Sequence, residues 1–329
     1  MWAYILRRAA LGVLTLFVIS IISFAIIQLP PGDFVSTALA ELAESGTETA
    51  DEFAAQLRAE YGLDRHIVVQ YGIWMGRVLQ GDLGTSFFHQ KPVLEVIGDR
   101  LPLSMLVSVS ALVFTLLIAI PIGIYSAVRQ YSAGDHIATF LGFLGLATPN
   151  FLLALVMLYA GFLWLDVSLA GLFSVEYATA PWSLAKLGDL LVHLPIPAIV
   201  LGTAGAAQLI RITRANLLDE KRQPYVTTAR AKGLSNRRAI GKYPVRVAMN
   251  PVASSVGLLF PNIVSGAVIV SVVLSLPTMG PVLLSSLLSQ DMYLAGAIIL
   301  LLGAFTVLGV FLSDLALMWL DPRIRHGNL

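Results

Sequence analysis

The sequence predicts an all-α polytopic membrane protein with about six transmembrane helices, on the evidence of its composition, its long apolar runs and its charge asymmetry. Of its 329 residues, 57% are hydrophobic and only 12% are charged. A soluble globular chain carries about 25% charged residues. This chain therefore has too little polar surface to cover a water-soluble globule of its size, and lipid is the expected second solvent.

About six apolar runs are long enough, as helix, to cross a hydrocarbon core about 30 Å thick. The first follows Arg7 and Arg8 and is longer than the core of a signal peptide, so we expect it to be retained. The third is too long to be one straight helix, and Pro149 should kink or break it. The expected spans are 9–29, 103–128, 137–165, 197–218, 251–276 and 292–320.

Basic residues gather in alternate loops and predict the orientation of the chain. If both termini face the cytoplasm, 15 of the 21 basic residues fall in cytoplasmic segments. In the same arrangement, 15 of the 20 acidic residues fall outside. Because short cytoplasmic loops of membrane proteins are enriched in lysine and arginine, the sequence favours this orientation over its inverse.

The loop lengths divide the chain into three parts. Residues 1–29 hold the cytoplasmic N-terminus and the first span, 30–100 lie outside, and 101–329 form a core domain with five further spans. The outer loop is too long for a simple connector, so we expect a small structured insertion that acts as a lid or plug. Thr49–Glu52 is a capping-box pattern that opens a short helix, and Gly62 is suited to end it. A loosely ordered loop is the alternative, which the loop's aromatic residues disfavour.

The most informative segment, 219–250, is strongly basic, is expected in the cytoplasm and is interrupted by glycine and proline. Within it, 227–232 reads as a short helix, and Gly233 is suited to terminate it. From composition alone, a basic cluster without a partner is an equally good interpretation.

The chain carries no motif for catalysis or for nucleotide binding. It lacks the G-x-x-x-x-G-K-[ST] phosphate loop, because Gly241 and Lys242 are followed by Tyr243. It has no cysteine, and its five histidines are scattered, so we expect no metal site, no cofactor and no catalytic residue. Asp314 lies near the inner end of the last span, where we expect an interfacial or helix-packing role.

A family resemblance is carried first by residues 225–235, which read Y-V-T-T-A-R-A-K-G-L-S. This run resembles the cytoplasmic loop of ABC importer permeases, in particular the first permease subunit of the pair in the dipeptide/oligopeptide (and nickel) permease family. Further matches follow in the family's order over nearly the whole chain: P-G-D at 31–33, Y-G-L-D at 61–64, G-D-L-G-T-S at 81–86, R-L-P at 100–102 and L-D-P-R-I-R at 320–325.

The chain also departs from the family's pattern at three places. Tyr243 stands where the family usually has histidine, and Val247 stands where it usually has asparagine. The acid that the family usually carries before the last span is missing from 271–280. These departures concern the substrate more than the family.

The resemblance implies a type I ABC importer permease fold in which 101–329 is the core permease domain. It also implies that the chain forms half of the pathway of an ATP-driven importer for peptides or a similar small solute, with oligosaccharides or nickel as alternative cargoes. The implied location is a bacterial or archaeal cytoplasmic (inner) membrane. The implied partners are a second homologous permease subunit, two ATPase subunits that hold ATP and Mg, an extracytoplasmic solute-binding protein and membrane lipid, with no nucleic acid.

The resemblance also assigns ATPase coupling to residues of the basic loop. Their spacings of four and three put Tyr225, Ala229 and Lys232 on one helical face. We expect Tyr225 to anchor this helix in a groove of one ATPase subunit, and Ala229 to let two backbones approach. The carried-over coupling residues are Tyr225, Thr228, Ala229, Arg230, Lys232, Gly233 and Leu234.

Two other classes of protein are compatible with the apolar spans alone. A secondary transporter or channel would usually carry inverted repeats or midplane charges, and the sequence shows neither. An intramembrane enzyme would need a nucleophile, a paired-acid or a metal-ligand set within the spans, and no such set is visible.

Overall fold

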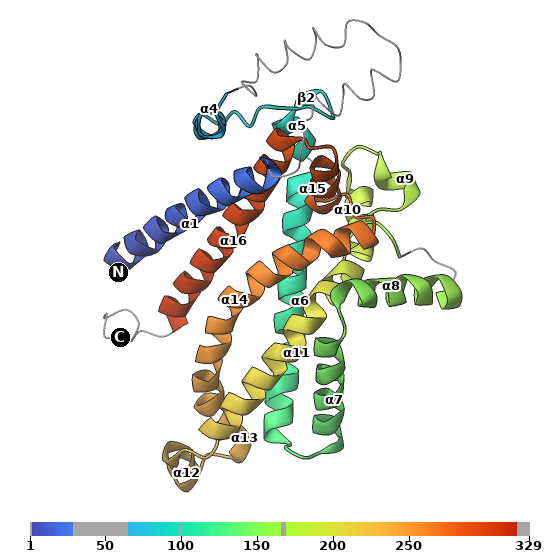
Figure 1. The fold of residues 1–329 in the computed structure, drawn as a ribbon. Helices are drawn as coiled ribbons and strands as arrows, with labels where there is room; N and C mark the ends of the chain where they lie inside the picture. The colour runs from blue at the N-terminus through green and yellow to red at the C-terminus, as the bar shows by residue number, and fades with distance from the viewer. Residues whose placement is uncertain (1, 29–64, 99, 166–168, 321–329) are drawn as a thin grey trace, which may run out of the picture. The chain divides into compact units, whose positions relative to one another are not determined.

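The computed structural model describes residues 2–28, 65–98, 100–165 and 169–320, and this part of the chain is mainly helical (Figure 1). Five of its helices are long and apolar enough to cross a membrane, or up to six if one bent pair counts as a single span. The expected all-α polytopic fold is confirmed. The elements are α1 (Trp2–Gln28), α4 (Ile67–Leu79), β1 (Thr85–Ser86), β2 (Lys91–Pro92), α5 (Val93–Gly98), α6 (Arg100–Val128), α7 (Ala133–Ala147), α8 (Asn150–Ala160), the π-helix η1 (Gly161–Leu165), α9 (Val175–Ala178), α10 (Leu184–His193), α11 (Pro195–Glu220), α12 (Pro224–Ala231), α13 (Asn236–Lys242), α14 (Pro244–Val273), α15 (Met279–Leu288) and α16 (Met292–Leu320).

The chain divides into two compact units. The first unit comprises Met1–Arg8, Ser104–Pro277 and Leu308–Leu329, and the second comprises Ala9–Leu103 and Thr278–Val307. The first unit therefore contains most of the long helices and both short helices of the basic loop.

Small residues bring α6 and α11 of the first unit close together. A Cβ atom on Gly123 would lie 2.6 Å from the Cβ of Thr213, and one on Gly202 would lie 2.9 Å from the carbonyl oxygen of Ala111. The hydroxyl of Thr115 donates a 3.1 Å hydrogen bond to the carbonyl of Gly202. In lipid, where apolar burial gives little driving force between helices, such close backbone approach and polar contacts stabilise packing.

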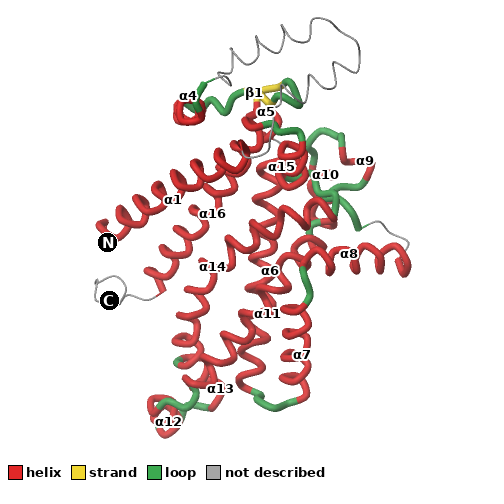
Figure 2. Tube along the Cα trace, in the orientation of Figure 1, coloured by secondary structure: helices red, strands yellow, loops and turns green. Residues whose placement is uncertain are grey.

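The third expected span is broken as the sequence predicts. Helix α7 ends at Ala147, α8 begins at Asn150, and the two helices meet at 107°. Pro149 occupies the N-cap position of α8, where the missing backbone N–H is not needed. Figure 2 shows the loop residues that separate the two helices.

Two helices begin earlier than the sequence suggests. Helix α1 begins at Trp2, so Arg7 and Arg8 lie inside the helix rather than before it. Helix α14 begins at Pro244 and carries Pro251 in its interior, although we expected the fifth span to begin at 251. Proline is well tolerated at a first helical position, and inside membrane helices hydroxyl groups offset the disturbed hydrogen bonding. One turn after the proline, the Ser255 hydroxyl donates a 2.8 Å hydrogen bond to the Pro251 carbonyl.

The described part of the outer loop is structured, and it is fastened to the start of α16 within the second unit. Asp291 is fully buried, and its Oδ2 accepts hydrogen bonds from the Ser86 hydroxyl at 2.5 Å and the Phe88 backbone N–H at 3.1 Å. Its Oδ1 accepts from the Leu294 N–H at 3.2 Å, which caps α16. The short helix expected over 49–62 lies outside the described residues.

Aromatic residues pack α4 against α1, also within the second unit. Trp74 is buried, and its ring lies 5.8 Å from that of Phe24 and 6.1 Å from that of Tyr71. The hydroxyl groups of Tyr71 and Ser20 are 2.9 Å apart. These contacts explain why this stretch of the loop is ordered rather than loose.

Asp314 is ion-paired within the first unit. Its Oδ2 lies 3.2 Å from Nη1 of Arg8. An ion pair between α1 and α16 agrees with the helix-packing role expected from the sequence.

Candidate functional site

The basic loop folds into two short helices, α12 and α13, which lie where α11 ends and α14 begins (Figure 1). Pro224 is the first residue of α12, because its fixed φ suits a helix start and its missing N–H is not needed there. Tyr243 separates α13 from α14, so the loop between the long helices ends about seven residues earlier than the expected boundary at Asn250.

Helix α12 ends in the turn that the sequence predicts at Gly233. Gly233 has φ of +88°, a conformation in which a Cβ atom is strained. The Leu234 N–H donates to the carbonyl of Ala229 at 3.2 Å, and the Gly233 N–H donates to that of Arg230 at 2.9 Å. These two bonds form a Schellman motif, which satisfies the last carbonyls of the helix and turns the chain out of it.

Tyr225 and Ala229, which we expected on one helical face, differ in their exposure. Val226 and Ala229 are 1% and 7% exposed, so the buried face of α12 carries these two residues. Tyr225 is 38% exposed. In this chain Ala229 therefore packs inward, and its role toward a partner stays a prediction.

The exposed face of α12 carries the remaining residues of the expected set. Thr228, Arg230 and Lys232 are exposed, and the Thr228 hydroxyl donates a 3.1 Å hydrogen bond to the Pro224 carbonyl. These side chains are open to a docking partner. Their charge is entirely positive, which favours an acidic partner surface.

Tyr225 fastens α12 to the end of α11. Its hydroxyl donates a hydrogen bond to the carboxylate of Glu220. Burial, together with this carboxylate, raises the pKa of Tyr225 to about 12, so the phenol keeps its proton at neutral pH. The ring is thus positioned by this chain before any partner binds.

A buried cluster joins α13 to the ends of three long helices. Ala127 of α6, Leu217 of α11, Ile240 of α13 and Ala248 of α14 pack together. The Lys221 ammonium adds a 2.6 Å hydrogen bond to the Ala127 carbonyl. Burial, followed by the nearby positive charges of Arg230 and Arg222, lowers the pKa of Lys221. The short helices are therefore attached to the long helices and not suspended on a loose loop.

The described part of this loop offers a surface for docking and no set of metal-ligating side chains. The described residues contain no group of three or more metal-ligating side chains. What they offer is a short exposed helix with a fixed end and a packed base. A partner that moves this helix will move the helix ends to which it is attached.

Sequence reasoning located α12 and its terminator but missed the residues that hold it. Glu220, Lys221 and Ile240 act through partners that sequence spacing does not reveal, such as Ala127, which lies 94 positions before Lys221. The one available signal was local: Glu220 precedes Tyr225 by five positions, and after Asp219 and Glu220 no acid follows up to residue 250.

Comparison with known proteins identifies the family to which this chain is similar. Residues 119–326 match the family described as "Binding-protein-dependent transport system inner membrane component". Residues 1–108 match the corresponding N-terminal family of membrane components. Together the two matches cover most of the chain, including α12 and α13.

Individual relatives agree with these matches over long alignments. The chain is 35% identical over 327 residues to "Oligopeptide transport system permease protein AppB" of Bacillus subtilis, covering 99% of this chain and 100% of the relative. It is 33% identical over 344 residues to "Dipeptide transport system permease protein DppB" of Escherichia coli K12, covering 99% of each. It is also 35% identical over 273 residues to "Oligopeptide transport system permease protein OppB" of Mycobacterium bovis, covering 81% of this chain and 83% of the relative. This chain belongs to the binding-protein-dependent transport system inner membrane component family, and it is an integral membrane permease subunit of an ABC transporter rather than an enzyme.

Proposed function

We propose that this permease forms half of the translocation pathway of an importer for peptides. The relatives above carry oligopeptide and dipeptide transport in their names, and they align with this chain over nearly its whole length. Oligosaccharides and nickel remain the alternative cargoes that the departures at Tyr243 and Val247 leave open.

The proposed assembly contains a second, homologous permease, two ATPase subunits that bind ATP and Mg, and an extracytoplasmic solute-binding protein. Both termini and α12–α13 face the cytoplasm, in a bacterial or archaeal cytoplasmic membrane. The basic residues of 221–246 support this orientation, since cytoplasmic loops are enriched in lysine and arginine. Residues 30–100 face outward and serve as a lid.

In this proposal α12 is the coupling helix. Its exposed face, with Tyr225, Thr228, Arg230 and Lys232, docks on one ATPase subunit. Gly233 and Leu234 fix the end of the helix, and Ala229 seats it on its own chain. ATP binding closes the ATPases, because they bind ATP more tightly in the closed state, and α12 then carries that movement to the permease helices.

One observation carries the proposal most directly: in a chain of the ABC permease family, an exposed, capped helix is bonded to the end of α11 through Tyr225 and Glu220, and the next short helix, α13, packs on the ends of α6, α11 and α14. A solvated basic cluster with no partner would need neither the Schellman turn nor the buried cluster beneath it.

The test is uptake by proteoliposomes that contain this chain with its partner permease, ATPases and solute-binding protein. We expect uptake of labelled di- to pentapeptides that requires ATP and the binding protein. Labelled oligosaccharide and nickel serve as competing cargoes. Uptake of one of these without peptide uptake would refute peptides as the cargo. Peptide uptake without ATP would refute the proposal of an ATP-driven importer.

A further inference from the structure

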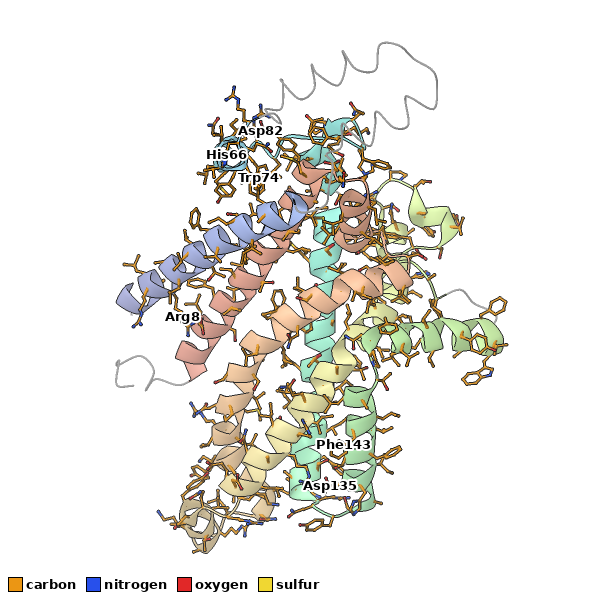
Figure 3. All side chains as sticks on the ribbon, in the orientation of Figure 1. Arg8, His66, Trp74, Asp82, Asp135 and Phe143 are labelled. Atoms are coloured by element: carbon orange, nitrogen blue, oxygen red, sulfur yellow. The ribbon has the colours of Figure 1, made fainter. Side chains whose placement is uncertain are left out.

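An ion pair with a buried acid and a partly exposed arginine joins α7 to α11 in the first unit. Arg214 on α11 donates from Nε to Oδ1 of Asp135 and from Nη2 to Oδ2, both at 2.8 Å. Asp135 lies in the first turn of α7 (Figure 3), and its side chain is 2% exposed. The two parallel bonds fix the orientation of the guanidinium group as well as its distance.

The same carboxylate holds the turn between α6 and α7. Its Oδ2 also accepts a 2.9 Å hydrogen bond from the backbone N–H of Tyr131, a residue with φ of +65°. The Ser132 hydroxyl accepts a 3.3 Å hydrogen bond from the Asp135 N–H and caps α7. Asp135 therefore bonds to three parts of the chain: the turn before α7, the N-cap residue of α7, and α11.

Stability alone is a poor explanation of this pair. Removing the Asp135 carboxylate and most of the Arg214 side chain from water is costly, and well-packed apolar residues often replace a buried ion pair with no loss of stability. What apolar residues cannot supply is a directional, two-bond connection between two helices. The geometry therefore favours a positional role.

The ion pair lies on the two helices that lead to α12 and to the break after α7. Arg214 lies on the helix that leads directly into α12. Near the other end of α7, a Cβ atom on Gly145 would lie 2.9 Å from Cγ2 of Thr203, so α7 also packs closely on α11 there. The 107° bend into α8 follows immediately. Helix α7 is thus held to α11 at both of its ends.

We propose that Asp135 and Arg214 are positioning residues for coupling, which lock α7 to α11 so that a movement of α12 reaches the α7–α8 break. This inference rests on the proposed function of α12. In this proposal the pair acts through the two helices that it joins.

The test compares Arg214→Lys with Arg211→Lys in the complete reconstituted transporter. Arg211 lies on the same helix, is exposed, and contacts the ring of Phe143 at 5.9 Å instead of an acid. Lysine keeps the charge but loses the two-bond fork. We expect Arg214→Lys to lower the solute transported per ATP hydrolysed by about threefold to tenfold, with ATPase subunits still bound, and Arg211→Lys to leave it unchanged.

A second variant separates position from stability. Asp135→Asn alone leaves a partly buried arginine without its acid and threatens folding. The double variant Asp135→Asn/Arg214→Gln removes both charges, so we expect a thermal midpoint near that of the wild type with the transport ratio still lowered. A ratio that recovers together with stability, or an unchanged ratio in Arg214→Lys, would overturn the inference. Such a result in an experiment where the wild-type complex still couples uptake to ATP would refute only this inference. The proposed function would stand.

Discussion

The ammonium group of Lys221 donates a 2.6 Å hydrogen bond to the carbonyl of Ala127, and this bond joins the end of α11 to the last turn of α6. Lys221 is the C-cap residue of α11, three residues before α12 begins. The bond therefore lies close before α12 in the chain, and Ala127 is also a member of the buried cluster that includes Ile240 of α13.

Replacing Lys221 with methionine keeps most of the side chain's length but removes the donor. The Ala127 carbonyl then loses its partner, which costs about 1–3 kcal/mol where the group stays away from water. We expect a lower thermal midpoint for the detergent-purified complex. Lys232→Met is the control, because Lys232 is exposed, and an equal effect of the two changes would refute the role of this bond.

Gly233 and Gly241 form a matched pair for the end of α12. At both glycines, a Cβ atom would meet no other atom within 4 Å, but only Gly233 has positive φ. Gly233→Ala should therefore cost about 1 kcal/mol or more through backbone strain, with Gly233→Val worse and Gly233→Asn milder. Gly241→Ala lies inside α13 and should be neutral or stabilising, because alanine favours helix.

The measurement for this pair is the amount of solute transported per ATP hydrolysed in proteoliposomes. We expect it to fall for Gly233→Val and to stay at the wild-type value for Gly241→Ala. Wild-type coupling and ATPase association in Gly233→Val would mean that the turn does not position a coupling helix.

Asp291 should be critical for the order of the hairpin formed by β1 and β2. Asp291→Ala removes the cap of α16 and leaves the Ser86 hydroxyl and the Phe88 N–H without their acceptor, at a cost of about 2 kcal/mol or more. Faster hydrogen exchange in the peptide that spans 84–92 would report this. Asp82→Ala is the comparison, since Asp82 accepts only a local, exposed bond from Gly84. Similar hydrogen exchange in both variants would contradict the claim that Asp291 holds this hairpin in place.

The orientation is testable by labelling, because the chain has no native cysteine. Glu176 and Ser235 are both exposed. An impermeant thiol reagent should modify cysteine at Glu176 in intact cells and modify cysteine at Ser235 only after the membrane is opened. The reverse pattern would invert the proposed topology.

Local signals predicted much of this fold. Apolar run length located the spans, Pro149 predicted the broken third span, and Gly233 predicted the end of α12. Each of these signals comes from the conformational limits of a single residue or from one continuous apolar stretch. Both can be read directly from a sequence. Proline misled at Pro251, because a helix in lipid continues through a proline when neighbouring groups offset the lost hydrogen bond.

Contacts between distant segments were not predictable. Asp135 meets Arg214 across 79 positions, and Ser86 meets Asp291 across 205. Nothing in local periodicity pairs such residues. The inward direction of Ala229 was missed for a related reason, since spacing defines which residues share a face but not which face is buried.

Photo-cross-linking from Thr228 tests the central claim, that the exposed face of α12 docks on an ATPase subunit, most directly. A benzophenone attached to cysteine at Thr228, in the assembled complex, should capture an ATPase subunit. The same probe at Glu176 should not. Capture of the ATPase from Thr228 alone is the predicted result, whereas no ATPase adduct from Thr228, or an adduct with the solute-binding protein, would contradict the account.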